Sequence, residues 1–167
     1  LHLDCVGGVL DNGTNIQAYT PNRTNAQRFW LTPTTVGMDG VWNIAASGDE
    51  SYLLDIAQES TAAGGNLEIN AANGSDSQKF IVQSVNDQYY LIRNLNSGLA
   101  LNVEGAGTAN GTNVQQWGNL STMLENEKWQ IIPNADGTYS FVSICNGLYL
   151  DLKSNNLADG TNVQMWA

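Results

Sequence analysis

The chain has 167 residues, of which 42% are hydrophobic and only 13% are charged, a size and composition that suit a single globular domain. Its formal net charge is −10, with only six Lys and Arg residues. This balance argues against nucleic acid or an anionic membrane surface as a partner, because both attract basic patches. No apolar run approaches the roughly 20 residues that a membrane span needs.

A self-similar segment begins at the start of the sequence and returns three times, with copies at 1–19, 52–70, 99–117 and 148–166. The first shared position is acidic or an amide and holds Asp4, Asp55, Asn102 and Asp151. Thirteen residues later come Gln17, Glu68, Gln115 and Gln164, and two residues further on come Tyr19, Asn70, Trp117 and Trp166. A period of 47 to 51 residues predicts a repeat architecture.

Two further elements occur in three copies each. The first is a Gln or Glu followed two residues later by an aromatic, in "AQRFW" with Gln27 and Phe29, "SQKFI" with Gln78 and Phe80, and "NEKWQ" with Glu127 and Trp129. The second is an alternating segment at 40–47, 88–94 and 138–144. All of these segments are short, alternate in polarity and are bounded by turn residues, so we predict strands. The chain is therefore expected to be all-β, with four strands in each repeat of about 49 residues.

The order of these elements resembles the ricin B-chain type of β-trefoil lectin, the family with a Gln-x-Trp repeat. The resemblance covers essentially the whole chain and implies twelve strands, arranged as a six-stranded barrel capped by three hairpins. It predicts one trefoil domain over residues 1–167. The repeats are expected at about 1–51, 52–98 and 99–147, with a half-repeat at 148–167.

The resemblance also implies non-catalytic binding of galactose- or xylose-type glycans. An aromatic ring can stack on the apolar face of a sugar, while a carboxylate and side-chain amides bind its hydroxyls. The implied carbohydrate-binding residues are Asp4, Gln17, Tyr19 and Asn25 in the first repeat, Asn102, Gln115 and Trp117 in the third, and Asp151, Gln164 and Trp166 in the fourth. In the third repeat, Asn102 replaces the usual Asp, so that site lacks the carboxylate for a charge-assisted bond. The second repeat has Asn70 in place of the ring, and we expect the second site to be dead or altered.

Each of these residues also has a structural interpretation. The recurring Asp could bond backbone N–H groups of a turn, and Trp117 and Trp166 could be half-buried packing residues. Gln27 and Gln78 are expected to satisfy buried backbone groups. The resemblance places Phe29, Phe80 and Trp129 in the barrel core.

The sequence does not predict an enzyme, a metal site or a cofactor. His2 is the single histidine, so a hydrolytic triad has no convincing base, and two cysteines with one histidine make no zinc set. The acidic residues recur at repeat-equivalent positions, which would scatter a pair of glycosidase carboxylates. We expect a secreted lectin or a binding module of a larger secreted glycoside hydrolase.

The strand count predicts a surplus. Four copies of the first two strands and three copies of the other two make fourteen, whereas a trefoil has twelve places. The half-repeats 1–20 and 148–167 would compete for one position, and the C-terminal one is joined to the preceding strand by a tight Asn146-Gly147 turn. Residues 1–20 could then form an arm exchanged between subunits, giving a homo-oligomer or a filament. The alternative to exchange is that the chain is a fragment of a longer protein with further repeats. The alternatives to a lectin are a structural protein with decayed sugar sites and a protease-inhibitor trefoil.

Overall fold

The computed structural model describes residues 2–6, 15–22, 25–27, 38–86, 88–118 and 123–167. The side chains of His2, Leu3, Ile16, Tyr19 and Asn25 lie outside this description. Contacts divide the chain into two compact units, Leu1–Gly37 and Met38–Ala167, and each unit is described here by itself. The expected single domain over residues 1–167 stays a prediction.

The first unit contains an antiparallel pair of strands, β1 (His2–Cys5) and β2 (Ile16–Tyr19), followed by the short 3₁₀ turn η2 (Asn25–Gln27). The strands pair with Asp4 opposite Gln17. Residues 28–30 of the predicted "AQRFW" strand, Phe29 among them, lie outside the described residues. The first unit therefore has the first two strands of a repeat in the register that the sequence pattern predicts.

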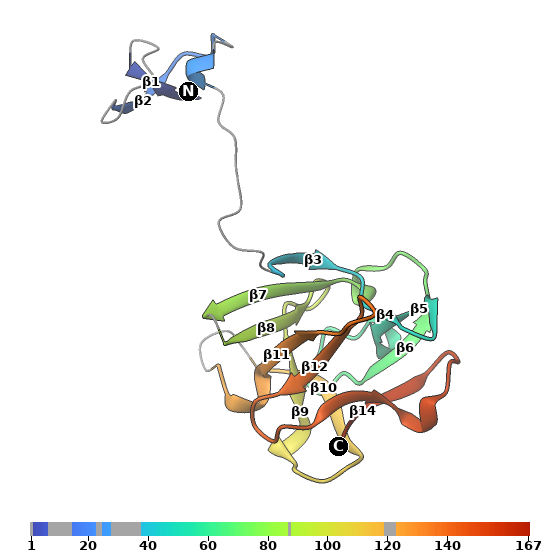
Figure 1. The fold of residues 1–167 in the computed structure, drawn as a ribbon. Helices are drawn as coiled ribbons and strands as arrows, with labels where there is room; N and C mark the ends of the chain where they lie inside the picture. The colour runs from blue at the N-terminus through green and yellow to red at the C-terminus, as the bar shows by residue number, and fades with distance from the viewer. Residues whose placement is uncertain (1, 7–14, 23–24, 28–37, 87, 119–122) are drawn as a thin grey trace. The chain divides into compact units, whose positions relative to one another are not determined.

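The second unit contains twelve strands in one connected sheet (Figure 1). These strands are β3 (Gly40–Trp42), β4 (Ala45–Ala46), β5 (Asp49–Ile56), β6 (Leu67–Ala71), β7 (Phe80–Asn86), β8 (Tyr89–Asn94), β9 (Ala100–Val103), β10 (Thr112–Trp117), β11 (Lys128–Pro133), β12 (Tyr139–Ser143), β13 (Tyr149–Leu152) and β14 (Thr161–Trp166). Short 3₁₀ turns connect some of them: η3 (Ala57–Glu59), η4 (Asp76–Gln78), η5 (Glu104–Ala106), η6 (Glu125–Glu127) and η7 (Lys153–Asn155). Within the described residues, no helix is long and apolar enough to cross a membrane.

The predicted all-β trefoil is confirmed. The hydrogen-bonded path runs from β10 through β9, β8, β11, β12 and β13 to β14, and it closes because β14 pairs with β10. β14 also pairs with β6, and an isolated bridge joins Asn66, just before β6, to Gln115 of β10. The second strands of three repeats, β6, β10 and β14, thus meet one another around a pseudo-threefold axis.

Three half-buried asparagines form a closed ring where these strands meet. Asn66 donates to Asn162 at 2.9 Å, Asn162 donates to Asn113 at 3.0 Å, and Asn113 donates to Asn66 at 3.0 Å. Each side-chain amide gives one hydrogen bond and accepts one, which satisfies part of its polar capacity without water. The ring fixes the relative register of the three second strands.

The core of the second unit is apolar and comes from all the repeats. Phe80 is 0% exposed and Trp129 is 1% exposed, and both belong to one cluster with Ile56, Leu67 and Val163. Alternation in the strands directs these side chains inward. The predicted core positions of Phe80 and Trp129 are therefore confirmed.

The C-terminal half-repeat takes a place in the barrel, because β13 pairs with β12 and β14 pairs with both β6 and β10. The predicted strand at 40–47 is not continuous but splits into β3 and β4. The split follows from the strand pairing: β3 pairs with β7, whereas β4 pairs with β5 across an irregular register. One strand therefore changes partner part-way along its length.

Candidate functional site

The fourth repeat brings its three predicted residues together on the β13–β14 hairpin. Asp151 lies directly opposite Gln164, and the amide Nε2 of Gln164 donates to Oδ2 of Asp151 at 3.0 Å. Trp166 follows two residues after Gln164 and therefore projects from the same face of the strand. Asp151 is half-buried, while Trp166 is 45% exposed. Gln164 itself is only 7% exposed, so the hairpin has a half-buried carboxylate, held by a buried amide, beside an accessible ring.

The third repeat has the same layout on β9 and β10 but without a carboxylate. Asn102 lies opposite Gln115 and is only 2% exposed, whereas Trp117 is 46% exposed. The turn of another repeat borders this site: a Cβ on Gly64 would lie 3.7 Å from the Trp117 ring and 4.0 Å from Oε1 of Gln115. The two tryptophans are neither fully buried nor fully free, so stacking on sugar stays a prediction for both.

In the second repeat, the polar side chains at the site positions hydrogen-bond one another. Asn70 donates from Nδ2 to Asp55 at 3.2 Å and to Glu68 at 2.9 Å. The carbonyl oxygen of the same Asn70 side chain accepts the backbone N–H of Gly160 at 3.0 Å. Asn70 therefore connects its own hairpin to the fourth repeat, at the position where the other repeats have a ring. This arrangement supports the prediction that the second site is dead or altered.

The first repeat is described only in part. Asp4 is buried and accepts from Gln17 at 3.2 Å and from Gln27 at 3.1 Å. The side chains of Tyr19 and Asn25, the predicted ring and the predicted second amide, lie outside the described residues. The structure therefore brings together Asp4 and Gln17 and leaves the rest of the first site a prediction.

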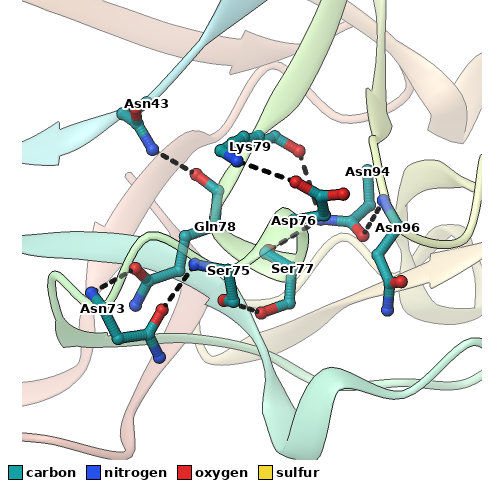
Figure 2. Close-up of polar contacts among 9 residues, drawn as sticks. All are labelled: Asn43, Asn73, Ser75, Asp76, Ser77, Gln78, Lys79, Asn94 and Asn96. Atoms are coloured by element: carbon teal, nitrogen blue, oxygen red, sulfur yellow. Dashed lines mark hydrogen bonds and ion pairs between the residues drawn. The ribbon is translucent and has the colours of Figure 1, made fainter.

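The Gln that opens the Gln-x-aromatic element is a structural connector. Gln78 is fully buried, accepts the N–H of Asn73 at 2.9 Å and donates to the carbonyl of Ala71 at 3.0 Å. Figure 2 shows this turn, in which Oδ1 of Asn73 also accepts the N–H of Ser75 and Asn43 bonds the carbonyl of Gln78. The expectation that this Gln satisfies backbone groups is confirmed.

Gln27 repeats the same contacts in the first unit. It accepts the N–H of Asn22 at 2.9 Å and donates to the carbonyl of Thr20 at 2.9 Å. In both copies Nε2 also donates to the recurring Asp, to Oδ2 of Asp4 at 3.1 Å or of Asp55 at 3.2 Å. Among the described residues, the donors to these two Asp side chains are side-chain amides and not turn backbone N–H groups.

The third repeat exchanges the carboxylate and the amide. Asn102 stands at the position of Asp55, and Glu127 stands at the position of Gln78. Glu127 is 1% exposed and accepts the N–H of Leu124 at 3.1 Å. Its other carboxylate oxygen lies so close to Gly118 that a Cβ there would clash with it. Gly118, with φ of +75°, follows directly after Trp117 and so links the Glu127 turn to the end of the third site.

Sequence reasoning missed Tyr149, which lies directly opposite Trp166 on β13 and is 46% exposed. The signal was present in the chain, because Tyr149 precedes Asp151 by two residues and strand alternation places both on one face. The corresponding residues of the other repeats in this unit are Leu53 and Ala100, so a search for shared residues could not find a ring that is special to one repeat.

Two ion pairs lie at the turns, each between an exposed carboxylate and a half-buried lysine. Lys79 pairs with Asp76 at 2.7 Å and Lys128 pairs with Glu125 at 2.5 Å, at equivalent positions of two repeats. The hydrogen bond to Glu125 raises the pKa of the Lys128 ammonium above its ordinary value. Among the described residues, no cluster of three or more His, Cys, Asp or Glu side chains could hold a metal ion.

The chain matches a family model. Residues 34–117 and 119–166 match the model described as "Ricin-type beta-trefoil lectin domain-like". No relative among curated proteins matches the chain.

Solved structures share the fold. The designed threefold-symmetric protein ThreeFoil is 32% identical with a TM-score of 0.73, and the match covers 77% of this chain and 90% of that one. An exo-β-1,3-galactanase from Clostridium thermocellum is 22% identical with a TM-score of 0.71, covering 93% of this chain and 30% of the galactanase. The Polyporus squamosus lectin is 19% identical with a TM-score of 0.66, covering 79% and 45%. The galactanase and the Polyporus lectin, at 22% and 19% identity, show that the fold is shared and no more.

The repeat pattern, the threefold meeting of β6, β10 and β14, and the family match over most of the sequence all agree. The chain therefore belongs to the ricin-type β-trefoil lectin domain-like family.

Proposed function

We propose that this chain binds carbohydrate without catalysing a reaction, and that the β13–β14 hairpin is its principal site. The observation that carries the proposal is the Gln164–Asp151 hydrogen bond of 3.0 Å beside a ring that is 45% exposed. Oδ2 of Asp151 is held by Gln164, and within the described residues no donor is bonded to Oδ1. That oxygen can accept a sugar hydroxyl in a charge-assisted bond while Trp166 stacks on the apolar face of the sugar.

The four candidate sites are proposed to differ in strength. The third site keeps the ring of Trp117 and the amide of Gln115, but the buried Asn102 supplies no charge, so we expect weaker binding there. The first site needs the side chains of Tyr19 and Asn25 in addition to Asp4 and Gln17. The second site has no ring, and Asn70 occupies its polar groups, so it should not bind.

Galactose- or xylose-type glycans are the proposed ligands. One structural neighbour is an exo-β-1,3-galactanase, and the Polyporus squamosus lectin structure is bound to Neu5Aca2-6Galb1-4GlcNAc, which contains galactose. Secretion is part of the same proposal, since extracellular glycans are the substrates that such a site would meet. The chain spans 30% of the galactanase, and a role as the binding module of a larger glycoside hydrolase is proposed on that likeness.

The test is a calorimetric titration of galactose and xylose into the chain and into two matched variants. Asp151→Ala should abolish binding at the fourth site with little change in the melting temperature, because Asp151 is only half-buried. Asp55→Ala should leave binding intact but lower the melting temperature, because the buried Asp55 accepts from Gln78 and Asn70. Absence of binding by the unmodified chain at millimolar sugar, or unchanged affinity in Asp151→Ala, would contradict the proposal.

Assembly by exchange of residues 1–20 is a second candidate function. It is favoured by the likeness of two hairpins: Asp4 lies opposite Gln17 on β1–β2, and Asp151 lies opposite Gln164 on β13–β14. Asn15 also precedes Gln17 by the two residues that separate Asn162 of the ring from Gln164. Light scattering after size-exclusion chromatography tests this candidate, and a monomer near 18.0 kDa at all concentrations would exclude it.

A further inference from the structure

The two rings on β13–β14 are neighbours across the strand pair. Tyr149 lies directly opposite Trp166, and the two side chains are 46% and 45% exposed. Directly opposite residues of an antiparallel pair have Cβ atoms about 5 Å apart on one face. Asp151 lies two residues after Tyr149 and Gln164 lies two residues before Trp166, so strand alternation places all four side chains on that face. The hairpin therefore carries a strip of two rings that ends at the Asp151 carboxylate.

The other two hairpins of the same unit carry no second ring at this position. Ala100 is opposite Trp117 and is 6% exposed, and Leu53 is opposite Asn70 and is 8% exposed. The core does not require an aromatic here, because a buried Leu or Ala occupies the same register elsewhere. The register alone therefore does not explain a large ring that is half in solvent beside a candidate site. Tyr149 lines a cavity of about 570 Å³ that Asp151 also lines.

From this pair of rings we infer that the fourth site extends over Tyr149 and takes two linked sugar rings, whereas the third site takes one. This inference rests on the proposed function. One sugar ring stacks on Trp166 and bonds Asp151 and Gln164. The next ring lies over Tyr149, whose phenol can both donate to and accept from a hydroxyl. The substrate class is thus a glycan chain of at least two units and not a single terminal sugar.

The two-ring site predicts a preference that can be measured as a ratio. The background is Tyr19→Ala with Trp117→Ala, which removes the rings of the first and third sites. There, β-1,3-galactobiose should bind about fivefold more tightly than galactose, and xylobiose should show the same trend over xylose if xylans are the ligand. Tyr149→Ala in that background should bring the ratio close to one. Tyr149→Phe should keep most of it, since the ring face remains.

Ile132→Ala is the control, because Ile132 is similarly exposed at 39% but lies on β11, outside the cavity that Tyr139 and Tyr149 both line. Its ratio should equal that of the parent. Where Tyr149→Ala fails to fold, Tyr149→Thr, a strand-forming replacement, takes its place. The ring resonances of Tyr149 in the unmodified chain give a second readout, and they should shift with disaccharide and not with monosaccharide.

The outcomes separate the two claims. If galactose and xylose bind at no site, the proposed function itself fails. If a monosaccharide binds but its disaccharide gains nothing, or if the gain survives Tyr149→Ala or Tyr149→Thr, the lectin function stands and the two-ring site is wrong. A gain that is lost equally in Ile132→Ala also overturns it, because the effect would then not belong to the strip on β13–β14.

Discussion

The amide of Gln78 donates to Oδ2 of Asp55 at 3.2 Å, and both side chains are buried. Gln78 also accepts the N–H of Asn73 and donates to the carbonyl of Ala71. Gln78→Met keeps the approximate volume and removes all these bonds, so the free energy of unfolding should fall by about 2–4 kcal/mol, since buried polar partners are left unsatisfied.

Urea denaturation measures this effect, and Gln88→Met is its control. Gln88 is exposed in the β7–β8 turn, and its replacement should change stability by less than about 0.5 kcal/mol. Equal losses in the two variants would show that the Gln78 network contributes little.

The asparagine ring should be cooperative. Asn113→Ala removes one donor and one acceptor and leaves Asn66 and Asn162 each with one lost bond. We expect a loss of about 1–3 kcal/mol in the free energy of unfolding. The double variant Asn113→Ala with Asn66→Ala should cost clearly less than twice that amount, because the bond between the two residues can be lost only once. Strictly additive losses, measured by thermal and urea unfolding, would contradict a coupled ring.

Gly118 should be far less replaceable than another glycine of similar backbone. A Cβ at Gly118 would clash with the Glu127 carboxylate, whereas Gly137, with φ of +88°, has no described atom within 4 Å. Gly137→Ala should cost about 1 kcal/mol for its left-handed conformation. Gly118→Ala should cost a further 1–3 kcal/mol, roughly, for overpacking. Chemical denaturation of both variants decides, and equal costs would mean that the Glu127 side chain moves aside freely.

Left-handed residues recur in the turn after the first strand of each repeat of the second unit. Ser154 has φ of +59° and Gly105, at the matching position, has φ of +58°. Ser154→Gly should therefore raise the free energy of unfolding by about 0.5 kcal/mol, after the entropic cost of glycine is subtracted. Gly105→Ala should lower it by about 1 kcal/mol, and no atom stands within 4 Å of the added Cβ. Effects of the same sign in these reciprocal variants, in matched melting curves, would refute the conformational explanation.

Asp136 should titrate below its usual range. The Thr138 hydroxyl and backbone N–H donate to its carboxylate and lower the pKa from 3.8. Because the folded-state pKa is depressed, the turn's contribution to stability is present above the unfolded pKa and is lost as the pH falls through the folded one. Carboxyl NMR titration should show the low pKa in the unmodified chain and a rise towards 3.8 in Thr138→Val. An unchanged pKa in that variant would remove the hydroxyl as the cause.

Much of this fold could be predicted from the sequence, because a repeat supplies its own alignment. The fixed spacing from Asp151 to Gln164 becomes a directly opposed pair on β13–β14, and the same holds for Asp55 and Glu68 on β5–β6. The Gln-x-aromatic pattern correctly indicated a buried ring at Phe80 and Trp129. Alternation and turn residues determine the strands locally, whereas the core position of the two rings followed from the family resemblance.

What could not be predicted depends on contacts between repeats or on departures from the pattern. The ring of Asn66, Asn113 and Asn162 joins residues 47 to 96 positions apart, and nothing in one copy reveals it. Tyr149 is an exposed ring at a position where the other two hairpins of this unit have Leu53 and Ala100, so a comparison of the repeats for shared residues passes over it. The split between β3 and β4 arises because two strands compete for one segment. Local propensity carries no information about these tertiary partners.

The asparagine ring has an electrical consequence. Its three amides run head to tail in one rotational sense, from Asn66 to Asn162 to Asn113 and back. Three equal dipoles related by threefold rotation cancel in the plane that they circulate in, so the ring adds almost no lateral field where three strands converge. In a chain with a net charge of −10, the three strands are thus joined at the axis by neutral amides, which add no further negative charge there.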